Sequence, residues 1–325
     1  MTKKLAGVIG ICAISCSLAA LTSIEVNAAT FKVDCSKNGG PSIQDRINNN
    51  ANPGDTIEIS GACTESVTVT KDSLRLVGVG GTVAPNGSGI NGSSGIVGGT
   101  SITAQAGENS VIVVLGRNVR IERLSISGGL SSTIVISRGG SARVIDSVVS
   151  DGGNDGIIAT RGTYIEVRQT EIKNNGRHGI FLRNSSSADI HLNDINNNGD
   201  SSNDGGVTVT GSSSADLDGN DIHDNAGDGV ILRRAASINF SSDPSVDPND
   251  RSNRISSNGD DGIVCFSNAA YRVAVNQTID GNGGDGTDRF DGCSARVANN
   301  VITCPPSLPG PSLTIPDPTL SCVAP

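Results

Sequence analysis

The sequence predicts an all-β fold in which the backbone winds as a parallel solenoid with three short strands in each coil. Three observations predict it: a spacing of 23 residues recurs along the chain, several apolar columns keep that spacing, and an asparagine follows one of the columns. The composition agrees, because no Trp, 2 Tyr and 5 Phe in 325 residues leave Ile, Val and Leu to fill the core. These residues suit sheets better than helices.

One apolar position recurs along the chain and is called the marker. It is occupied, at intervals of 23, 23, 23, 27, 33, 24 and 23 residues, by Ile126, Val149, Ile172, Ile195, Ile222, Ile255, Ile279 and Ile302. Such periodicity is typical of repeat architectures, in which each repeat buries its apolar face against its neighbours. A repeat of 23 residues is too short for three hairpin strands with their connections, but it suits one coil of a parallel β-solenoid.

Two further apolar columns stay in register with the marker. The column eight residues after the marker, with Val207 in a lengthened coil, contains Ile157, Ile180, Val207, Val230, Ile263 and Thr287. The column five residues before the marker contains Ile121, Val144, Val167, Ile190, Leu217 and Val297. Each column lies in a short alternating segment, so we expect each strand to pair with its equivalent one coil away, at roughly 4.8 Å.

An asparagine stands three residues after the marker at Asn175, Asn198, Asn225, Asn258 and Asn282, and a glycine follows within two residues each time. Asn tolerates the left-handed turn conformation, and stacked side-chain amides can hydrogen-bond along an axis. The pattern therefore predicts an asparagine ladder at one of the turns.

The two ends of the chain differ from the repeat. Residues 29–54 are expected to form a strand and a short capping helix, because Ser42 and Asp45 make a capping box and Ile43 and Ile47 share one helical face. Such a helix would shield the open end of a solenoid, here residues 55–304. Residues 305–325 are proline-rich and cannot continue the ladder, so we expect them to form a tail.

Residues 1–28 have the features of a secretory signal peptide, with Lys3 and Lys4 before a short apolar run and small residues at a cleavage site. Cys16 leaves a lipoprotein as the alternative. We expect a secreted or periplasmic protein with no membrane span. The chain has a net charge of −9, which disfavours nucleic acid as a partner.

The cysteines that remain after the signal peptide are even in number: Cys35, Cys63, Cys265, Cys293, Cys304 and Cys322. In an exported chain an even set predicts disulfides. Pairing of nearest neighbours would join Cys35 to Cys63, Cys265 to Cys293 and Cys304 to Cys322, although the sequence does not fix the connectivity. Metal ligation is the weaker interpretation, because their spacing is unlike that of a zinc site.

With its asparagine column, three-strand coil and helical cap, this chain resembles the right-handed parallel β-helix proteins of the pectate-lyase-like superfamily, with coils of about 23 residues. That superfamily includes polysaccharide lyases, glycoside hydrolases, uronate epimerases and proteins with no known activity, so the resemblance does not fix a function. The resemblance implies a sugar-binding groove on the outward face of the strand that follows the asparagine. There Phe181, Arg183 and Arg233 are the candidate substrate-binding residues.

His178 is the candidate catalytic base, because it occupies a column otherwise held by aspartate, with Asp155 one coil below and Asp204 about one coil above. Flanking carboxylates would raise the pKa of His178 and orient its ring, and Arg183 could hold a substrate carboxylate. The alternative is that His178 is a turn residue that bridges two acidic neighbours for stability.

A second group of side chains, Asp228, Asp260, Asp261 and Asp285, is the candidate metal site. Carboxylates at neighbouring coils repel one another unless a cation or protons intervene, and Ca²⁺ prefers such oxygen ligands. Carboxylates about 5 Å apart would also suit a retaining glycosidase. The alternative is a set of solvated turn aspartates.

These features favour a secreted protein that binds a polysaccharide and cleaves or epimerises it if the histidine is catalytic, as a lyase, hydrolase or epimerase. The alternative is a non-catalytic surface or matrix module whose aspartates are turn residues or bind calcium. A self-associating filament is a third alternative, but the cap and the tail argue against end-to-end stacking, so we expect a monomer. The lengthened coils at 199–205 and 240–254 are further candidate binding loops.

Overall fold

The structure, a computed structural model, describes residues 28–37, 39–80, 82–85, 94–97, 99–241, 252–273, 278–283, 287–288 and 294–297. The predicted signal peptide up to residue 27, the proline-rich tail, Ile302, Asp285 and the predicted bond between Cys304 and Cys322 lie outside these residues. Within them, no helix is long and apolar enough to cross a membrane.

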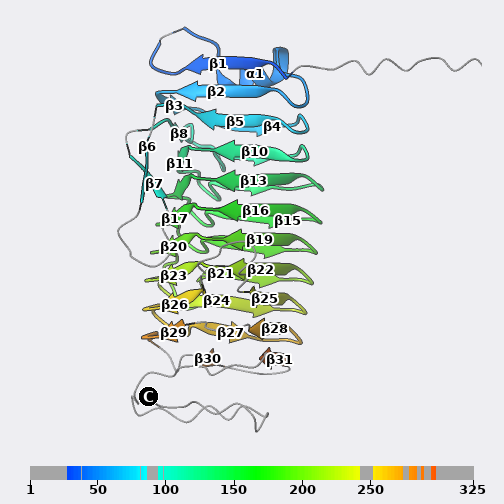
Figure 1. Cartoon of the computed structure of the whole chain (residues 1–325), viewed down its shortest axis with the longest axis vertical. Helices are drawn as coiled ribbons and strands as arrows, with labels where there is room; N and C mark the ends of the chain where they lie inside the picture. The colour runs from blue at the N-terminus through cyan, green and yellow to red at the C-terminus, as the bar shows by residue number, and fades with distance from the viewer. Residues whose placement is uncertain are drawn as a thin grey trace, which may run out of the picture.

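The chain is a right-handed parallel β-helix, as predicted, with its coils stacked along the long axis of the molecule (Figure 1). Sheet A consists of β1 (Thr30–Asp34), β2 (Thr56–Ser60), β5 (Arg75–Gly78), β10 (Val119–Glu122), β13 (Ser141–Ile145), β16 (Tyr164–Arg168), β19 (Ser187–His191), β22 (Ser214–Asp218), β25 (Ser237–Ser241), β28 (Ala270–Val273) and β31 (Ser294–Val297).

Sheet B consists of β3 (Ala62–Thr64), β8 (Ser101–Thr103), β11 (Ser125–Ser127), β14 (Val148–Ser150), β17 (Glu171–Lys173), β20 (Asp194–Asn196), β23 (Asp221–His223), β26 (Arg254–Ser256) and β29 (Thr278–Asp280). Sheet C consists of β4 (Val67–Val69), β9 (Ile112–Val114), β12 (Ile134–Ile136), β15 (Ile157–Thr160), β18 (Ile180–Arg183), β21 (Gly205–Thr210), β24 (Asp228–Arg233), β27 (Ile263–Cys265) and β30 (Thr287–Asp288). An antiparallel hairpin of β6 (Thr82–Pro85) and β7 (Ser94–Val97) interrupts the repeat in the Gly- and Ser-rich region.

The predicted register is confirmed, because the marker residues are direct partners in sheet B. Ile172 pairs with Ile195, and Ile195 pairs with Ile222 although the coil between them has 27 residues. The other two apolar columns stack in the same way in sheets A and C. All three columns point inward, and Ile172, Ile190 and Ile180 are fully buried. The core is therefore a set of aliphatic stacks, one for each sheet.

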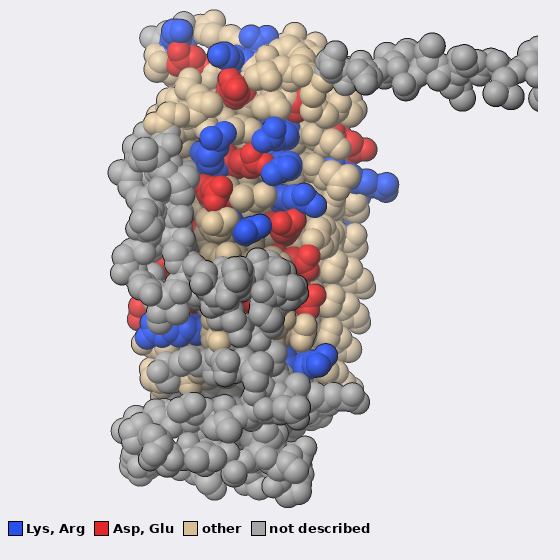
Figure 2. Space-filling model, in the orientation of Figure 1, with Lys and Arg blue, Asp and Glu red and all other residues tan. Residues whose placement is uncertain are grey.

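The outward face of sheet A carries a column of charged side chains. Arg75 and Arg120 both contact Glu122, at 2.8 and 2.5 Å, and Arg143 contacts Glu166 at 2.9 Å. Figure 2 shows these basic and acidic side chains interleaved over β10, β13 and β16. In this part of the face, the charges of neighbouring coils neutralise one another.

The helix α1 (Ile43–Asn49) caps the first coils, as predicted, with a capping box formed by Ser42 and Asp45 and with Ile43 and Ile47 buried. Its N-terminal amides are also satisfied from the solenoid, because the carboxylate of Glu65 accepts from the backbone N–H groups of Ile43 and Gln44 at 3.0 and 2.7 Å. A negative charge at this end of a helix is favourable.

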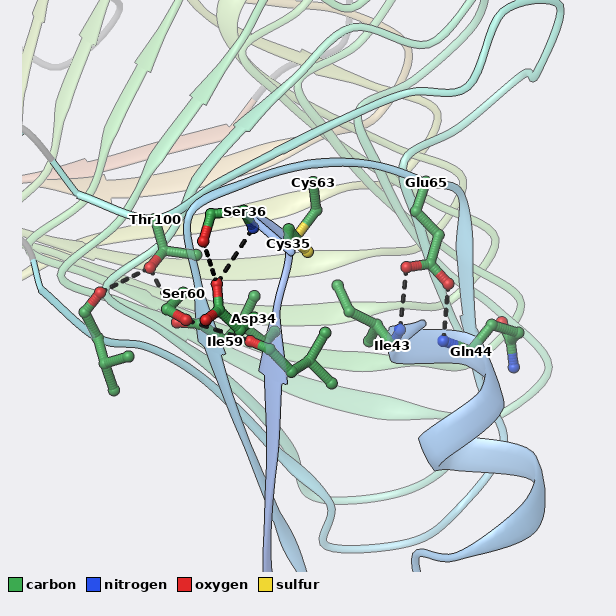
Figure 3. The surroundings of a disulfide bond; sticks show 12 residues. Asp34, Cys35, Ser36, Ile43, Gln44, Ile59, Ser60, Cys63, Glu65 and Thr100 are labelled. Atoms are coloured by element: carbon green, nitrogen blue, oxygen red, sulfur yellow. Dashed lines mark hydrogen bonds between the residues drawn. A yellow bond between two sulfur atoms is a disulfide. The ribbon is translucent and has the colours of Figure 1, made fainter. Parts of the chain in front are cut away.

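The disulfide between Cys35 and Cys63 ties β1 to β3 beside the cap (Figure 3). This is the first of the three predicted pairings. Cys265 is disulfide-bonded as well, but its predicted partner, Cys293, lies outside the described residues.

The predicted asparagine ladder lies between sheets B and C. From Asn198 onward, each side-chain oxygen accepts from both the backbone N–H and the side-chain amide of the asparagine one coil earlier. The distances from side-chain amide to oxygen are 2.8, 3.0, 2.9 and 2.9 Å along Asn175, Asn198, Asn225, Asn258 and Asn282. A second ladder, which the sequence analysis missed, joins Asn193, Asn220 and Asn253 between sheets A and B.

The left-handed conformation expected for the ladder asparagines falls on other residues. The left-handed residue of this turn stands one position earlier, as at Asn174 (φ 55°) and Asn197 (φ 53°), while the ladder asparagines serve as hydrogen-bonding groups. The glycine that follows the aspartate column is required by the packing of neighbouring coils. At Gly179 a Cβ would lie 2.7 Å from the carbonyl oxygen of Gly206, so the close approach of the next coil requires glycine.

Candidate functional site

The sequence analysis placed the candidate catalytic group, His178, at the turn that leads into β18 of sheet C. The imidazole is 2% exposed and lies 4.9 Å from the Phe181 ring, measured between ring centroids. The backbone N–H of Gly205 donates to Nδ1 at 3.1 Å, and the Thr208 hydroxyl lies 3.1 Å from the same nitrogen. Nδ1 is therefore the acceptor nitrogen, and the hydrogen-bond network assigns the proton to Nε2.

The electrostatic expectation for His178 was wrong in direction. Burial lowers the pKa of His178 to about 4, and the positive charges of Arg177 and Arg233 act in the same direction. The opposing effect of Asp204 is outweighed. The imidazole is thus neutral at pH 7, and its unprotonated nitrogen is occupied by the next coil.

The two flanking aspartates have other partners. Asp155 is 5% exposed, and its Oδ2 accepts from the Ser132 hydroxyl at 3.4 Å. Burial raises the pKa of Asp155 to about 6, against the opposing positive charge of Arg177. Asp204 accepts from Arg177 Nε at 3.1 Å and from the Ser201 hydroxyl at 2.8 Å. These hydrogen bonds hold the pKa of Asp204 below its usual value although burial opposes them.

The predicted substrate-binding residues lie together on the outward face of sheet C. The guanidinium of Arg183 lies over the Phe181 ring, 5.6 Å from its centroid, and Arg233 lies over Phe266 at 5.7 Å. Arg183 is exposed, while Arg233 is half-buried and donates to the carbonyl oxygen of Asn203 at 3.2 Å. Burial lowers the pKa of Arg233.

The apolar column beside these arginines points outward but is largely shielded from solvent. Ile158 is 7% exposed, Thr208 2%, Ile231 0% and Val264 3%. The predicted groove floor is therefore closed over most of its length, and the accessible part of this face lies at Phe181 and Arg183.

Three of the four predicted metal-binding residues converge. One carboxylate oxygen from each of Asp228, Asp260 and Asp261 lies within 4.8 Å of the other two, whereas Asp285 lies outside the described residues. The Asp261 backbone N–H donates to Asp228 Oδ1 at 3.0 Å. Burial raises the pKa of Asp228 to about 7, and the charges of Asp260 and Asp261 add to the effect. This oxygen set fits a hard cation such as Ca²⁺.

Sequence reasoning missed a polar cluster on the outward face of sheet B. His223 Nε2 lies 3.0 Å from Asp194 Oδ1 and Nδ1 lies 2.7 Å from Asp224 Oδ2, and the hydrogen bond to Asp194 is the main reason why the pKa of His223 is raised to about 9. Asp221 is 2% exposed, and no described residue donates a hydrogen bond to either of its oxygens. The signal was present, because Asp194 and Asp221 both stand one residue before the marker and therefore face outward.

Comparison with known proteins agrees with the coil geometry. The family described as the right handed beta helix region matches residues 132–302, so the chain belongs to this family. No curated protein sequence matches the chain.

Among solved structures, the chain is similar to the pectate lyase Pel9A, with 12% identity over 82% of this chain and 80% of that one and a TM-score of 0.55. It is also similar to the A-module of the Azotobacter vinelandii mannuronan C-5 epimerase AlgE6, with 15% identity over 85% and 76% of the two chains and a TM-score of 0.52. At these identities the likeness establishes the fold alone.

Proposed function

We propose that the chain is an exported protein that binds an acidic polysaccharide along the outward face of sheet C. The observation that carries this proposal is the pair of stacked arginines: Arg183 over Phe181 and Arg233 over Phe266. A guanidinium held over a ring keeps its fork of donors oriented, and such forks bind carboxylates in bidentate fashion.

The local charge supports an anionic ligand. The chain as a whole has a net charge of −9, yet Arg177, Arg183 and Arg233 lie on or beside this face. Arg177 is partly neutralised by Asp204, whereas no described residue forms a salt bridge with Arg183. The pectate lyase and the mannuronan epimerase, by their names, act on polysaccharides, which supports this ligand class by analogy.

Cleavage or epimerisation of the same ligand is the second candidate function. The observation that favours it is Asp155, whose pKa of about 6 would allow it to exchange a proton near neutral pH. His178 is less suited as a base, because its unprotonated nitrogen already accepts from Gly205. In this activity Asp155 would move the proton and Arg183 would hold the substrate carboxylate.

The proposed location is outside the cytoplasm, and the proposed structural ion is calcium. A disulfide between Cys35 and Cys63 is typical of an oxidising compartment and supports a secreted or periplasmic location. The convergence of Asp228, Asp260 and Asp261 supports calcium as a structural ion, which would also serve a non-catalytic matrix module.

Binding is tested with the mature protein and three soluble polymers: polymannuronate, polygalacturonate and neutral dextran. We expect binding to at least one polyuronate, no binding to dextran, and at least tenfold weaker binding after Arg183→Ala. Glu108→Ala, at an exposed turn three coils away from Arg183, is the matched surface control. Equal binding of Arg183→Ala and the native chain would refute the proposed site.

Catalysis is tested in the same samples by following unsaturated products, new reducing ends and the epimer ratio. Asp155→Asn should abolish any product formation while leaving polymer binding intact. Absence of product from every polymer, with binding retained, would leave the protein as a binding module.

A further inference from the structure

A groove of about 400 Å³ lies on the outward face of sheet A, on a different face of the solenoid from the arginine pair. It crosses β19, β22, β25 and β28, and it runs between two outward columns. One column contains Ser187, Ser214 and Ser237, and the other contains Asp189, Asp216, Asn239 and Arg272. Its volume lies within the range of ligand sites.

The polar side chains in this groove differ from those higher on the same face. In the coils of β5 to β16, the column that continues into Asp189 consists of Arg75, Arg120, Arg143 and Glu166. All four side chains form ion pairs, either with Glu122 or with one another (Figure 2). Lower down, Asp216 and Arg272 are exposed and Asn239 is half-buried, and no hydrogen bond or ion pair joins these three side chains to any described residue. Their donors and acceptors are therefore open to a ligand.

Tyr164 lies on β16, one coil before the first strand that lines the groove. It stands directly above Ser187 in the serine column, it is 36% exposed, and its hydroxyl donates to Asp189 Oδ2 at 2.6 Å. This bond holds the ring across the space between the serine column and the carboxylate column. The chain has no Trp and only 2 Tyr, so an exposed and anchored tyrosine at this place is unusual for the molecule.

The chemistry of the groove indicates a sugar chain without charge. Carboxylates and amides accept from and donate to sugar hydroxyls, and a fixed aromatic ring offers its face to the C–H groups of a pyranose. The rungs repeat every 4.8 Å or so, which is close to the advance of one sugar residue in an extended chain. The two carboxylates of Asp189 and Asp216 outnumber the one guanidinium, Arg272, among the lining residues, so the groove has a net negative charge. That charge would repel a polyuronate, which separates this ligand from the one proposed for sheet C.

We propose that this groove binds a neutral oligosaccharide along the solenoid axis, with one sugar ring against Tyr164 and the following hydroxyls on Asp216 and Asn239. The site goes beyond the proposed function, since it uses another face and an uncharged ligand. A protein with both sites would link an acidic polymer to a neutral one.

The test is calorimetric titration of the mature protein with neutral hexasaccharides (cellohexaose, mannohexaose and xylohexaose), with hexamannuronate and an amino-sugar hexamer as further arms. We expect at least one neutral hexasaccharide to bind, and both Tyr164→Ala and Asp216→Ala to weaken its binding at least tenfold. Tyr164→Phe keeps the ring and loses only the hydroxyl bond, so it should weaken binding less than Tyr164→Ala does.

Controls separate this site from the one on sheet C. Leu130→Ala and Glu108→Ala remove an exposed apolar and an exposed acidic side chain outside the groove and should leave binding unchanged. Thermal unfolding of each variant establishes that the fold is retained. Hexamannuronate binding should respond to Arg183→Ala and not to Tyr164→Ala.

Three outcomes would overturn the proposal. No neutral hexasaccharide binds, or neutral binding survives in both groove variants, or binding is confined to the amino-sugar hexamer and is lost in high salt. Failure of the sheet C experiments would leave this test intact, because its ligands and variants are different.

Discussion

The backbone N–H of Gly205 donates to Nδ1 of His178 across neighbouring coils at 3.1 Å. The same relationship recurs farther along the column, where the Asp261 N–H donates to Asp228 Oδ1 at 3.0 Å. His178 therefore has the same structural role as Asp228: its side chain accepts a hydrogen bond from a backbone N–H of the next coil. Its place in an aspartate column is explained by this bond without a catalytic role.

Removal of that acceptor should destabilise the fold. His178→Ala leaves the buried Gly205 N–H without a partner, which typically costs about 1–3 kcal/mol in the free energy of unfolding. His178→Asp restores the acceptor found in other coils and should recover part of the loss. Chemical denaturation of the three proteins measures the difference, and equal midpoints for His178→Ala and the native chain would contradict this role.

The pH dependence of stability gives a second prediction about the same group. The pKa of His178 falls from an ordinary 6.5 to about 4 on folding, so the unfolded chain binds the proton more tightly. The contribution of His178 to the free energy of unfolding is complete above pH 6.5. As the pH falls from 6.5 toward 4, the free energy of unfolding decreases by roughly 3 kcal/mol.

The measurement is the free energy of unfolding of the native chain and of His178→Asn between pH 4 and 7. The native chain should lose more stability than the variant as the pH falls. His223 supplies a contrast of opposite sign, because its raised pKa of about 9 stabilises the fold below pH 6.5 and the contribution disappears as the pH rises through 9. Parallel curves for native and His178→Asn would rule out a buried, neutral His178.

The sequence could predict whatever is repeated in register. The pairing of Ile172 with Ile195, the asparagine ladder and the helix cap all follow from local chemistry that recurs or that obeys a capping rule. The environment of His178 could not be predicted in this way, because its pKa depends on burial and on Arg233, which lies two coils away. The groove near Tyr164 was missed because its polar residues follow no recognisable sequence pattern. Which of them have hydrogen-bond partners can be seen only in the folded chain.

The asparagine ladder should be a major source of stability. Asn198 accepts from both the backbone and side-chain amides of Asn175, and it donates to Asn225 Oδ1 and to the carbonyl oxygen of Ile172. Asn198→Ala leaves these buried groups unsatisfied, and we expect a loss of about 2–4 kcal/mol in the free energy of unfolding.

The exposed Asn203 is the matched control, because its side chain is outside the ladder. Asn203→Ala should change the midpoint of denaturation little. Asn198→Asp keeps an acceptor but replaces the donor to Asn225 with a second acceptor, so it should be destabilising at pH 7 and recover toward the native value when the carboxylate is protonated. A ladder variant as stable as its control would show that the stacked amides are not a net source of stability.

Calcium should stabilise the native chain if the carboxylates of Asp228, Asp260 and Asp261 hold it. The three carboxylates, each with an oxygen within 4.8 Å of the other two, repel one another. A cation bound between them removes this repulsion, and it stabilises only the folded state, because only the folded chain brings the three carboxylates together. At 100 times its dissociation constant, a bound ion adds about 2.7 kcal/mol to the free energy of unfolding. Thermal unfolding in EDTA and in excess Ca²⁺ should therefore give a higher midpoint with the ion.

Asp260 is the half-buried member of the cluster. A substitution there removes one metal ligand without replacing a buried side chain. Asp260→Asn lowers the repulsion, so it should raise the midpoint in EDTA and abolish most of the rise caused by Ca²⁺. Glu108→Gln removes one exposed carboxylate elsewhere and should keep the full calcium effect. An equal calcium response in Asp260→Asn and Glu108→Gln would place the ion, if one binds, at some other site on the chain.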